Sequence, residues 1–264
     1  MLEIKNVSKT FNPGTVNAKT ALNGLNLTLN DGDFVTVIGG NGAGKSTMLN
    51  AVAGTIQVDT GSIILDGRDI TRLPEFKRAA YLGRVFQDPM MGTAATMQIE
   101  ENLALADRRG KRRTLHPGIT QADRERYIEQ LKILDLGLEN RMTAKVGLLS
   151  GGQRQALTLL MATLQKPKLL LLDEHTAALD PKTAAKVLEA TQRIVEKNHL
   201  TTMMITHNMR DAITYGNRLI MMYEGHVAVD VSGEEKRHLT VEQLLELFSK
   251  ASGSDEADDK LLLS

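Results

Sequence analysis

The sequence has no cysteine, no net charge and no long apolar run. Without cysteine the chain cannot form disulfides, thiolate zinc sites or a cysteine nucleophile, which fits a cytoplasmic protein. Lysine plus arginine balance aspartate plus glutamate at 32 each, so the chain as a whole is not built to coat nucleic acid or an acidic membrane. Apolar runs such as Leu169–Leu172 are far too short to span a bilayer.

The first residues also lack the basic and apolar stretches of a signal peptide. We therefore expect a soluble chain that is not exported and binds no nucleic acid, so any membrane role must come through a partner. The length of 264 residues suggests one domain with at most a small subdomain. We place this domain at residues 1–250 and expect the small, acidic tail at 251–264 to be mobile.

Apolar patterning predicts strands that alternate with helices over most of the chain. One mostly apolar run, residues 33–38, stops at a glycine cluster, which is typical of a buried strand that enters a loop. A helix should follow at 46–53, and Asp180-Pro181 is an N-cap with proline at the first helical position. This alternation indicates an α/β fold with a mainly parallel sheet. The other expected strands are 2–7, 25–30, 62–65, 168–172 and 201–206, with a hairpin at 217–231 and a last helix at 240–248.

Residues 98–147 lack strong strand signals and carry apolar residues at helical spacing after a capping box at Thr120 and Asp123. We expect a helical subdomain, at about 98–165, inserted in the α/β core. A basic run at 108–113 lies within it. Such a run is most often a solvated loop, and contact with lipid headgroups or RNA is the alternative.

A phosphate-binding loop is predicted at residues 39–46, which match G-x-x-x-x-G-K-[ST] between an expected strand and an expected helix. Glycines allow the backbone N–H groups to turn inward around a phosphate, and the helix points its positive end at the same anion. Lys45 would neutralise the β- and γ-phosphates, and Ser46 would offer a hydroxyl to Mg²⁺. The alternative, a flexible glycine turn, does not explain the Lys-Ser pair. The predicted nucleotide-binding residues here are Gly39, Asn41, Gly42, Ala43, Gly44, Lys45, Ser46 and Thr47.

Two carboxylates, Asp173 and Glu174, end the apolar strand at 169–172. A buried strand should not finish in two acids without a cause, because an unpaired buried charge is costly. The strand could simply emerge into solvent. Beside a phosphate loop, a better account is that Asp173 holds Mg²⁺ and Glu174 polarises the attacking water.

Leu149-Ser150-Gly151-Gly152-Gln153 lies between the phosphate loop and this strand. Ser150 should cap a helix, and Gly151 and Gly152 expose backbone N–H groups at its positive end, which makes a second phosphate-binding surface. The pentapeptide resembles the signature of ABC ATPases, and the likeness extends over about residues 1–231. The resemblance implies a P-loop core with an antiparallel N-terminal β subdomain. It also implies that residues 150–153, Gln153 included, contact ATP held by a second copy in a head-to-tail dimer.

Other residues are assigned through this resemblance alone. Phe11 stands where the family places an aromatic that stacks on adenine, although a core phenylalanine is the plain alternative. Gln87 resembles the glutamine that senses Mg²⁺ and the attacking water. His207 resembles the histidine that contacts the γ-phosphate, and with Glu174 and Gln87 it completes the expected catalytic set. Two positions depart from the family pattern: His175 stands where proline is usual, and Ala178 where serine is usual. Neither departure removes a catalytic group, and both bear only on the fine geometry between the two nucleotide sites.

The resemblance implies an ATP-hydrolysing subunit that needs ATP and Mg²⁺ and energises transport on the cytoplasmic face of a membrane. Its expected partners are a second ATPase copy, transmembrane permease subunits and a substrate-binding protein. The segment 173–184 resembles ATPases of aromatic-amino-acid-type importers, which suggests uptake of an amino acid or another small solute. The alternatives are a soluble ABC ATPase, of the iron–sulfur assembly or translation type, and the ATPase of an exporter or lipid-extraction system.

Overall fold

The computed structural model describes residues 1–111 and 117–252, which fall into two compact units. The first unit joins Met1–Arg78 to the chain from Leu200 onward, and the second is Ala79–His199. Residues 112 and 113 of the basic run, and 253–264 of the expected mobile tail, lie outside the described residues.

An antiparallel sheet opens the first unit, with its strands in the order β2-β1-β4-β5. Leu2 pairs with Leu29 on one side and with Leu65 on the other, so the alternating apolar residues of three strands share one buried face. This is the antiparallel N-terminal β subdomain that the family resemblance predicts. Its strands are β1 (Leu2–Phe11), β2 (Lys19–Leu29), β4 (Thr60–Leu65) and β5 (Arg68–Asp69).

A second group of strands in this unit has the order β10-β9-β3-β8. β3 runs parallel to both β8 and β9, and its five residues are all buried, as the predicted apolar run requires. The remaining elements of this unit connect or cover these strands. The bounds are β3 (Phe34–Ile38), α1 (Lys45–Ala53), α2 (Glu75–Arg78), β8 (Thr202–Ile205), α7 (Met209–Thr214), β9 (Arg218–Tyr223), β10 (His226–Ser232), α8 (Gly233–Arg237) and α9 (Val241–Ser252).

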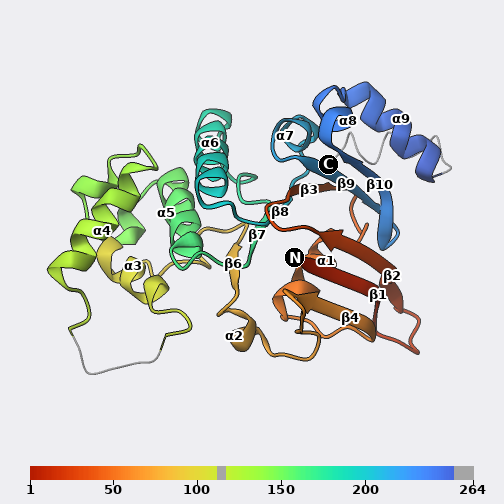
Figure 1. The fold of residues 1–264 in the computed structure, drawn as a ribbon, viewed down its shortest axis with the longest axis horizontal. Helices are drawn as coiled ribbons and strands as arrows, with labels where there is room; N and C mark the ends of the chain where they lie inside the picture. Colours follow the sequence, from red (N-terminus) through yellow and green to blue (C-terminus); the bar gives the residue numbers. More distant parts are fainter. Residues whose placement is uncertain (112–116, 253–264) are drawn as a thin grey trace. The chain divides into compact units, whose positions relative to one another are not determined.

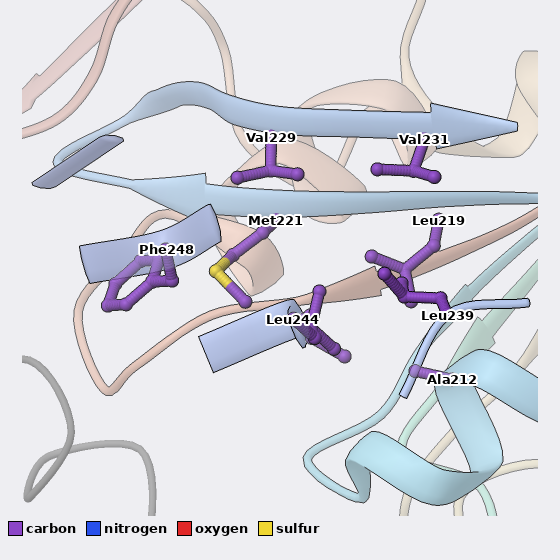
Figure 2. Close-up of a cluster of buried hydrophobic side chains, with 9 residues drawn as sticks. Ala212, Leu219, Met221, Val229, Val231, Leu239, Leu244 and Phe248 are labelled. Atoms are coloured by element: carbon purple, nitrogen blue, oxygen red, sulfur yellow. The ribbon is translucent and has the colours of Figure 1, made fainter. Parts of the chain in front are cut away.

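The C-terminal helix α9 contributes to the core of the first unit and lies beside β10 (Figure 1). Leu244 and Phe248 on α9 are buried with Met221 on β9 and Val229 on β10, and Figure 2 shows these side chains gathered in one cluster. Tyr223 meets the Phe248 ring edge to face, with 5.6 Å between centroids. Burial of this face anchors α9 to the sheet.

The second unit contains a parallel pair of strands and a set of helices. Its long amphipathic helix begins where the sequence places an N-cap: the Asp180 side chain accepts a hydrogen bond from the N–H of Thr183, and Pro181 follows. The expected capping box at Thr120 and Asp123 is present at the start of an earlier helix, α4. The bounds are β6 (Leu82–Val85), α3 (Ile99–Asp107), α4 (Gln121–Lys132), α5 (Gly151–Thr163), β7 (Leu169–Asp173) and α6 (Pro181–Asn198), with short 3₁₀ turns at Leu138–Asn140 and Val146–Leu148.

The fold is therefore α/β, with parallel strand pairs in both units and an antiparallel N-terminal sheet. Helices α3, α4 and α5 occupy the stretch for which a helical subdomain is predicted. Among residues 1–111 and 117–252, no helix has the length and apolar character needed to cross a membrane.

Candidate nucleotide site

The phosphate loop joins the buried strand β3 to the helix α1. Two of its glycines could not be any other residue without a backbone clash. A Cβ on Gly39 (φ 147°) would lie 2.3 Å from the carbonyl oxygen of Met222, and one on Gly44 (φ 101°) would lie 2.5 Å from that of Ala21. These close approaches hold the loop against β9 and β2, so its shape is set by the unit around it.

Lys45 is the first residue of α1, and its side chain turns back into the loop. Its Nζ donates to the carbonyl oxygen of Gly39 at 2.6 Å and to that of Gly40 at 3.3 Å. Asn41, Gly42 and Ser46 are exposed, so these positions of the loop are accessible to a ligand. The positive end of α1 and the Lys45 ammonium together form a site for a phosphate group.

Lys19 on β2 brings a second ammonium group to this loop. Its Nζ lies 3.1 Å from the position that a Cβ on Gly42 would occupy. Phe11 on β1 is the register partner of Lys19 and is 38% exposed. The phosphate loop, the exposed ring and a further cation are therefore neighbours within one unit. Lys19 belongs to no sequence motif, and only the pairing of β1 with β2 places it opposite Phe11.

His207 follows β8, the parallel neighbour of β3. Val37 and Ile205 are register partners, so Gly39 and His207 each come two residues later, at the same edge of the sheet. Asn208 then caps α7, with its side chain accepting from two backbone N–H groups. The register thus brings His207 to the phosphate loop.

In the second unit, β7 ends in the predicted carboxylate pair. Its four leucines are fully buried, whereas Asp173 is partly exposed and lies 3.5 Å from the guanidinium of Arg84. Glu174 has a left-handed backbone conformation, with φ 44°, which is costly for any residue other than glycine. The next residue, His175, is fully buried, and burial lowers the pKa of its imidazole to about 4, so the ring is neutral.

The glycine pair at 151–152 begins α5, as the sequence predicts. Ser150 is its N-cap and forms a capping box with Gln153, in which each side chain bonds the other's backbone N–H. A cavity of about 210 Å³ lies against this helix start, and Lys182 and Lys186 on α6 contribute two cationic side chains to its lining. Backbone N–H groups and two cations make this end of α5 suitable for an anion.

Gln87 is exposed in the loop after β6. The buried Gln155 on α5 donates from Nε2 to the carbonyl oxygen of Phe86 at 3.0 Å. The Arg84 guanidinium stacks over the Phe86 ring, with 4.6 Å to the centroid. These contacts connect the loop that carries Gln87 to the helix that Ser150 caps.

A family model described as "ABC transporter" matches residues 22–177, which is more than half of the chain. The chain belongs to the ABC transporter family. It is an ATP-binding and ATP-hydrolysing subunit, as the signature and the phosphate loop predict, and the soluble and exporter alternatives are not favoured.

Curated relatives and solved structures agree with this ABC assignment. The tyrosine transport ATP-binding protein of Clostridioides difficile (strain R20291) is 47% identical over 252 residues, which cover 95% of this chain and 100% of that protein. The spermidine/putrescine import ATP-binding protein PotA of Haemophilus influenzae is 35% identical over 235 residues, which cover 89% of this chain but only 59% of that protein. An ATP-binding cassette solved as a dimer in a post-hydrolysis state with ADP and Pi has 30% identity and a TM-score of 0.75, covering 88% of this chain and 98% of that one.

The predicted site residues of this ABC subunit fall into two sets, one in each unit. The first unit holds Phe11, the loop 39–47 and His207, together with the unpredicted Lys19. The second holds Gln87, the residues 150–153, Asp173 and Glu174. Within each unit the register and the side-chain contacts bring the members of a set to neighbouring elements.

Proposed function

We propose that this chain powers the uptake of an aromatic amino acid through a membrane permease, with tyrosine as the first solute to test. The full-length relationship to a tyrosine transport ATP-binding protein carries this proposal, because 47% identity extends over the whole of that relative. PotA, the polyamine-import relative, matches over only 59% of its length and is less similar. Polyamine uptake is therefore the second candidate.

In the proposed mechanism, Lys45 and the N-terminal end of α1 bind the β- and γ-phosphates, with Lys19 as a further cation and Phe11 stacking on adenine. His207 contacts the γ-phosphate, and residues 150–153 contact the γ-phosphate held by a second copy of the chain. Glu174 polarises the attacking water, and Gln87 senses it. ATP thus favours the closed dimer, and hydrolysis lets the two copies separate.

Magnesium fits the oxygen donors that the proposed site offers. Ser46 presents an exposed hydroxyl in the first turn of α1, and Asp173 a partly exposed carboxylate at the end of β7. Hydroxyl, carboxylate and amide oxygens are the ligands that Mg²⁺ prefers beside phosphates. We assign Ser46, Asp173 and Gln87 to the ion, which would neutralise charge on the transferring phosphoryl group.

We propose that the permease docks on apolar side chains near the Gln87 loop, which would place the chain peripherally on the cytoplasmic face of the membrane. Met91 and Leu148 are 69% and 71% exposed, although both are large and apolar. Arg154 connects their two segments, since its guanidinium contacts the sulfur of Met90 and donates to the carbonyl oxygen of Gly147 at 3.1 Å. We further propose that the helical subdomain at about 98–165 transmits the motion and that a substrate-binding protein delivers the solute.

Three measurements test these assignments. Glu174→Gln should retain ATP binding and form an ATP-dependent dimer in solution while hydrolysis falls by orders of magnitude, whereas Lys45→Ala should weaken nucleotide binding itself. Leu148→Glu should prevent co-purification with the permease, and Val16→Glu, a matched exposed position in the other unit, should not. A normal hydrolysis rate in Glu174→Gln would show that the base is wrongly assigned.

The solute is tested in liposomes that contain the permease, this chain and the binding protein. We expect ATP-dependent accumulation of labelled tyrosine and none of labelled spermidine. Accumulation of spermidine alone would replace the first candidate with the second.

A further inference from the structure

A buried histidine follows the proposed catalytic carboxylate and is bonded to a different element. His175 is 2% exposed, and its Nε2 lies 3.1 Å from the hydroxyl oxygen of Thr191 on α6, which is itself fully buried. The Thr191 hydroxyl donates its only proton to the carbonyl oxygen of Val187 at 2.8 Å. The histidine must therefore be the donor in the bond to Thr191, which fixes its Nε2–H tautomer.

Glu174 needs such a restraint because of its backbone. A glutamate at φ 44° occupies the left-handed region, which persists only where the surrounding structure enforces it. On the N-terminal side, β7 holds the chain through its fully buried leucines. On the C-terminal side, His175 is the first buried side chain, and the two residues after Thr176 are exposed.

Two backbone bonds lie within the loop beyond His175. The N–H of Ala177 donates to the carbonyl oxygen of Glu174 at 3.0 Å, and that of Leu179 donates to the carbonyl oxygen of Thr176 at 3.1 Å. These two backbone bonds shape the loop from within. The side-chain bond from His175 to Thr191 ties the start of this loop to the third turn of α6.

We infer that His175 and Thr191 are a positioning pair that holds the Glu174 carboxylate in its working orientation for ATP hydrolysis. His175 acts through Glu174 and touches no nucleotide. A proline, usual here in the family, would restrain the backbone through its ring and would bias the preceding residue toward an extended conformation. In this chain a side-chain bond supplies the restraint and leaves Glu174 in the left-handed region. The inference rests on the proposed role of Glu174 as the residue that polarises the attacking water.

The test compares two substitutions that differ in one functional group. Thr191→Val keeps the shape and removes the hydroxyl that accepts from His175, whereas Thr191→Ser keeps the hydroxyl. We expect Thr191→Val to lower kcat for ATP hydrolysis by about five- to tenfold with KM changed less than twofold, and Thr191→Ser to restore kcat to within twofold. Thr163→Val is the matched control, because Thr163 is also a buried helical threonine whose hydroxyl bonds backbone carbonyl oxygens, and it should leave kcat unchanged.

Coupling between the two residues is measured by a double-mutant cycle. If they act through their mutual bond, His175→Leu combined with Thr191→Val should be no slower than His175→Leu alone. All assays are run on the full chain at a temperature below each variant's unfolding transition. A normal kcat in Thr191→Val, or equal losses in Thr191→Val and Thr191→Ser, would overturn the inference and leave the pair a packing contact.

Glu174→Gln in the same assay separates this inference from the function on which it rests. If Glu174→Gln is inactive and Thr191→Val is normal, the positioning role fails and the proposed mechanism stands. If Glu174→Gln hydrolyses ATP at the normal rate, the assignment of Glu174 fails and the positioning role with it.

Discussion

Replacing Arg78 by methionine should destabilise the chain by about 3–5 kcal/mol, a cost typical of breaking a buried charged network. Arg78 is 1% exposed. Its guanidinium donates to the carbonyl oxygens of Ala51 and Val52, at 2.6 and 2.8 Å, and to those of Leu73 and Thr71, at 2.8 and 2.9 Å. Ala51 and Val52 lie in the last turn of α1. Arg78 therefore holds the C-terminal end of the helix whose N-terminal end forms the phosphate site.

The magnitude follows from two opposing terms. Hydrogen bonds to a charged group contribute roughly 1.5–3 kcal/mol each, so four such bonds make a gross term on the order of 6–12 kcal/mol. Removing the charged guanidinium from water costs several kcal/mol and opposes this stabilisation. The same desolvation lowers the pKa of Arg78. The difference gives the expected loss.

Urea unfolding of Arg78→Met and of the wild-type chain measures this loss directly. Arg72→Met serves as the matched control, because Arg72 is exposed and its loss should change the free energy of unfolding by less than about 0.5 kcal/mol. If Arg78→Met unfolds within about 1 kcal/mol of the wild-type chain, the bonds to α1 contribute little net free energy and the reasoning is refuted.

Three further predictions concern the first unit. Lys19→Ala should weaken ATP binding up to about tenfold in equilibrium titrations, and the control Lys5→Ala should not. If Lys19→Ala binds ATP as tightly as the wild-type chain, Lys19 is not part of the site. Burial lowers the pKa of Lys236 to about 8, below the ordinary 10.5, so between these values the unfolded chain binds a proton that the folded chain does not. The free energy of unfolding should therefore rise with pH across this window, and more in the wild-type chain than in Lys236→Met. Equal slopes of this free energy against pH in the two proteins would contradict the prediction. Phe248→Ala should cost about 3–5 kcal/mol in urea unfolding if α9 is part of the core, and a loss below about 1 kcal/mol would show that it is not.

Much of the fold and of the motif-bearing segments could be predicted because the local signals were strong. The mostly apolar run before Gly39 and the four leucines before Asp173 each end at a glycine or an acid, so the sequence predicts β3 and β7. The N-caps at Ser150 and Asp180 fixed the starts of α5 and α6. In each case the information lies within a few consecutive residues.

Other features depend on contacts that are distant in the sequence. β6 was not predicted because Gly83 and Arg84 interrupt its apolar pattern, yet a Cβ on Gly83 would lie 2.6 Å from the carbonyl oxygen of Ala162. Lys236 is buried and donates to the carbonyl oxygens of Tyr215 and Gly216, and nothing in the sequence around it indicates this burial. The local sequence pattern does not indicate such tertiary contacts.

The close packing of α5 against α6 affects how substitutions in the signature should be read. A Cβ on Gly152 would lie 1.9 Å from the Cγ2 methyl group of Thr183, whereas one on Gly151 would meet Leu179 at an ordinary 3.4 Å. A single Gly152→Ala change would therefore push two helix starts apart, and lost activity could not be attributed to the phosphate contact. Combining Gly152→Ala with Thr183→Ser removes the obstructing methyl group. A loss of activity in this double variant would then reflect the contact between the signature and the nucleotide.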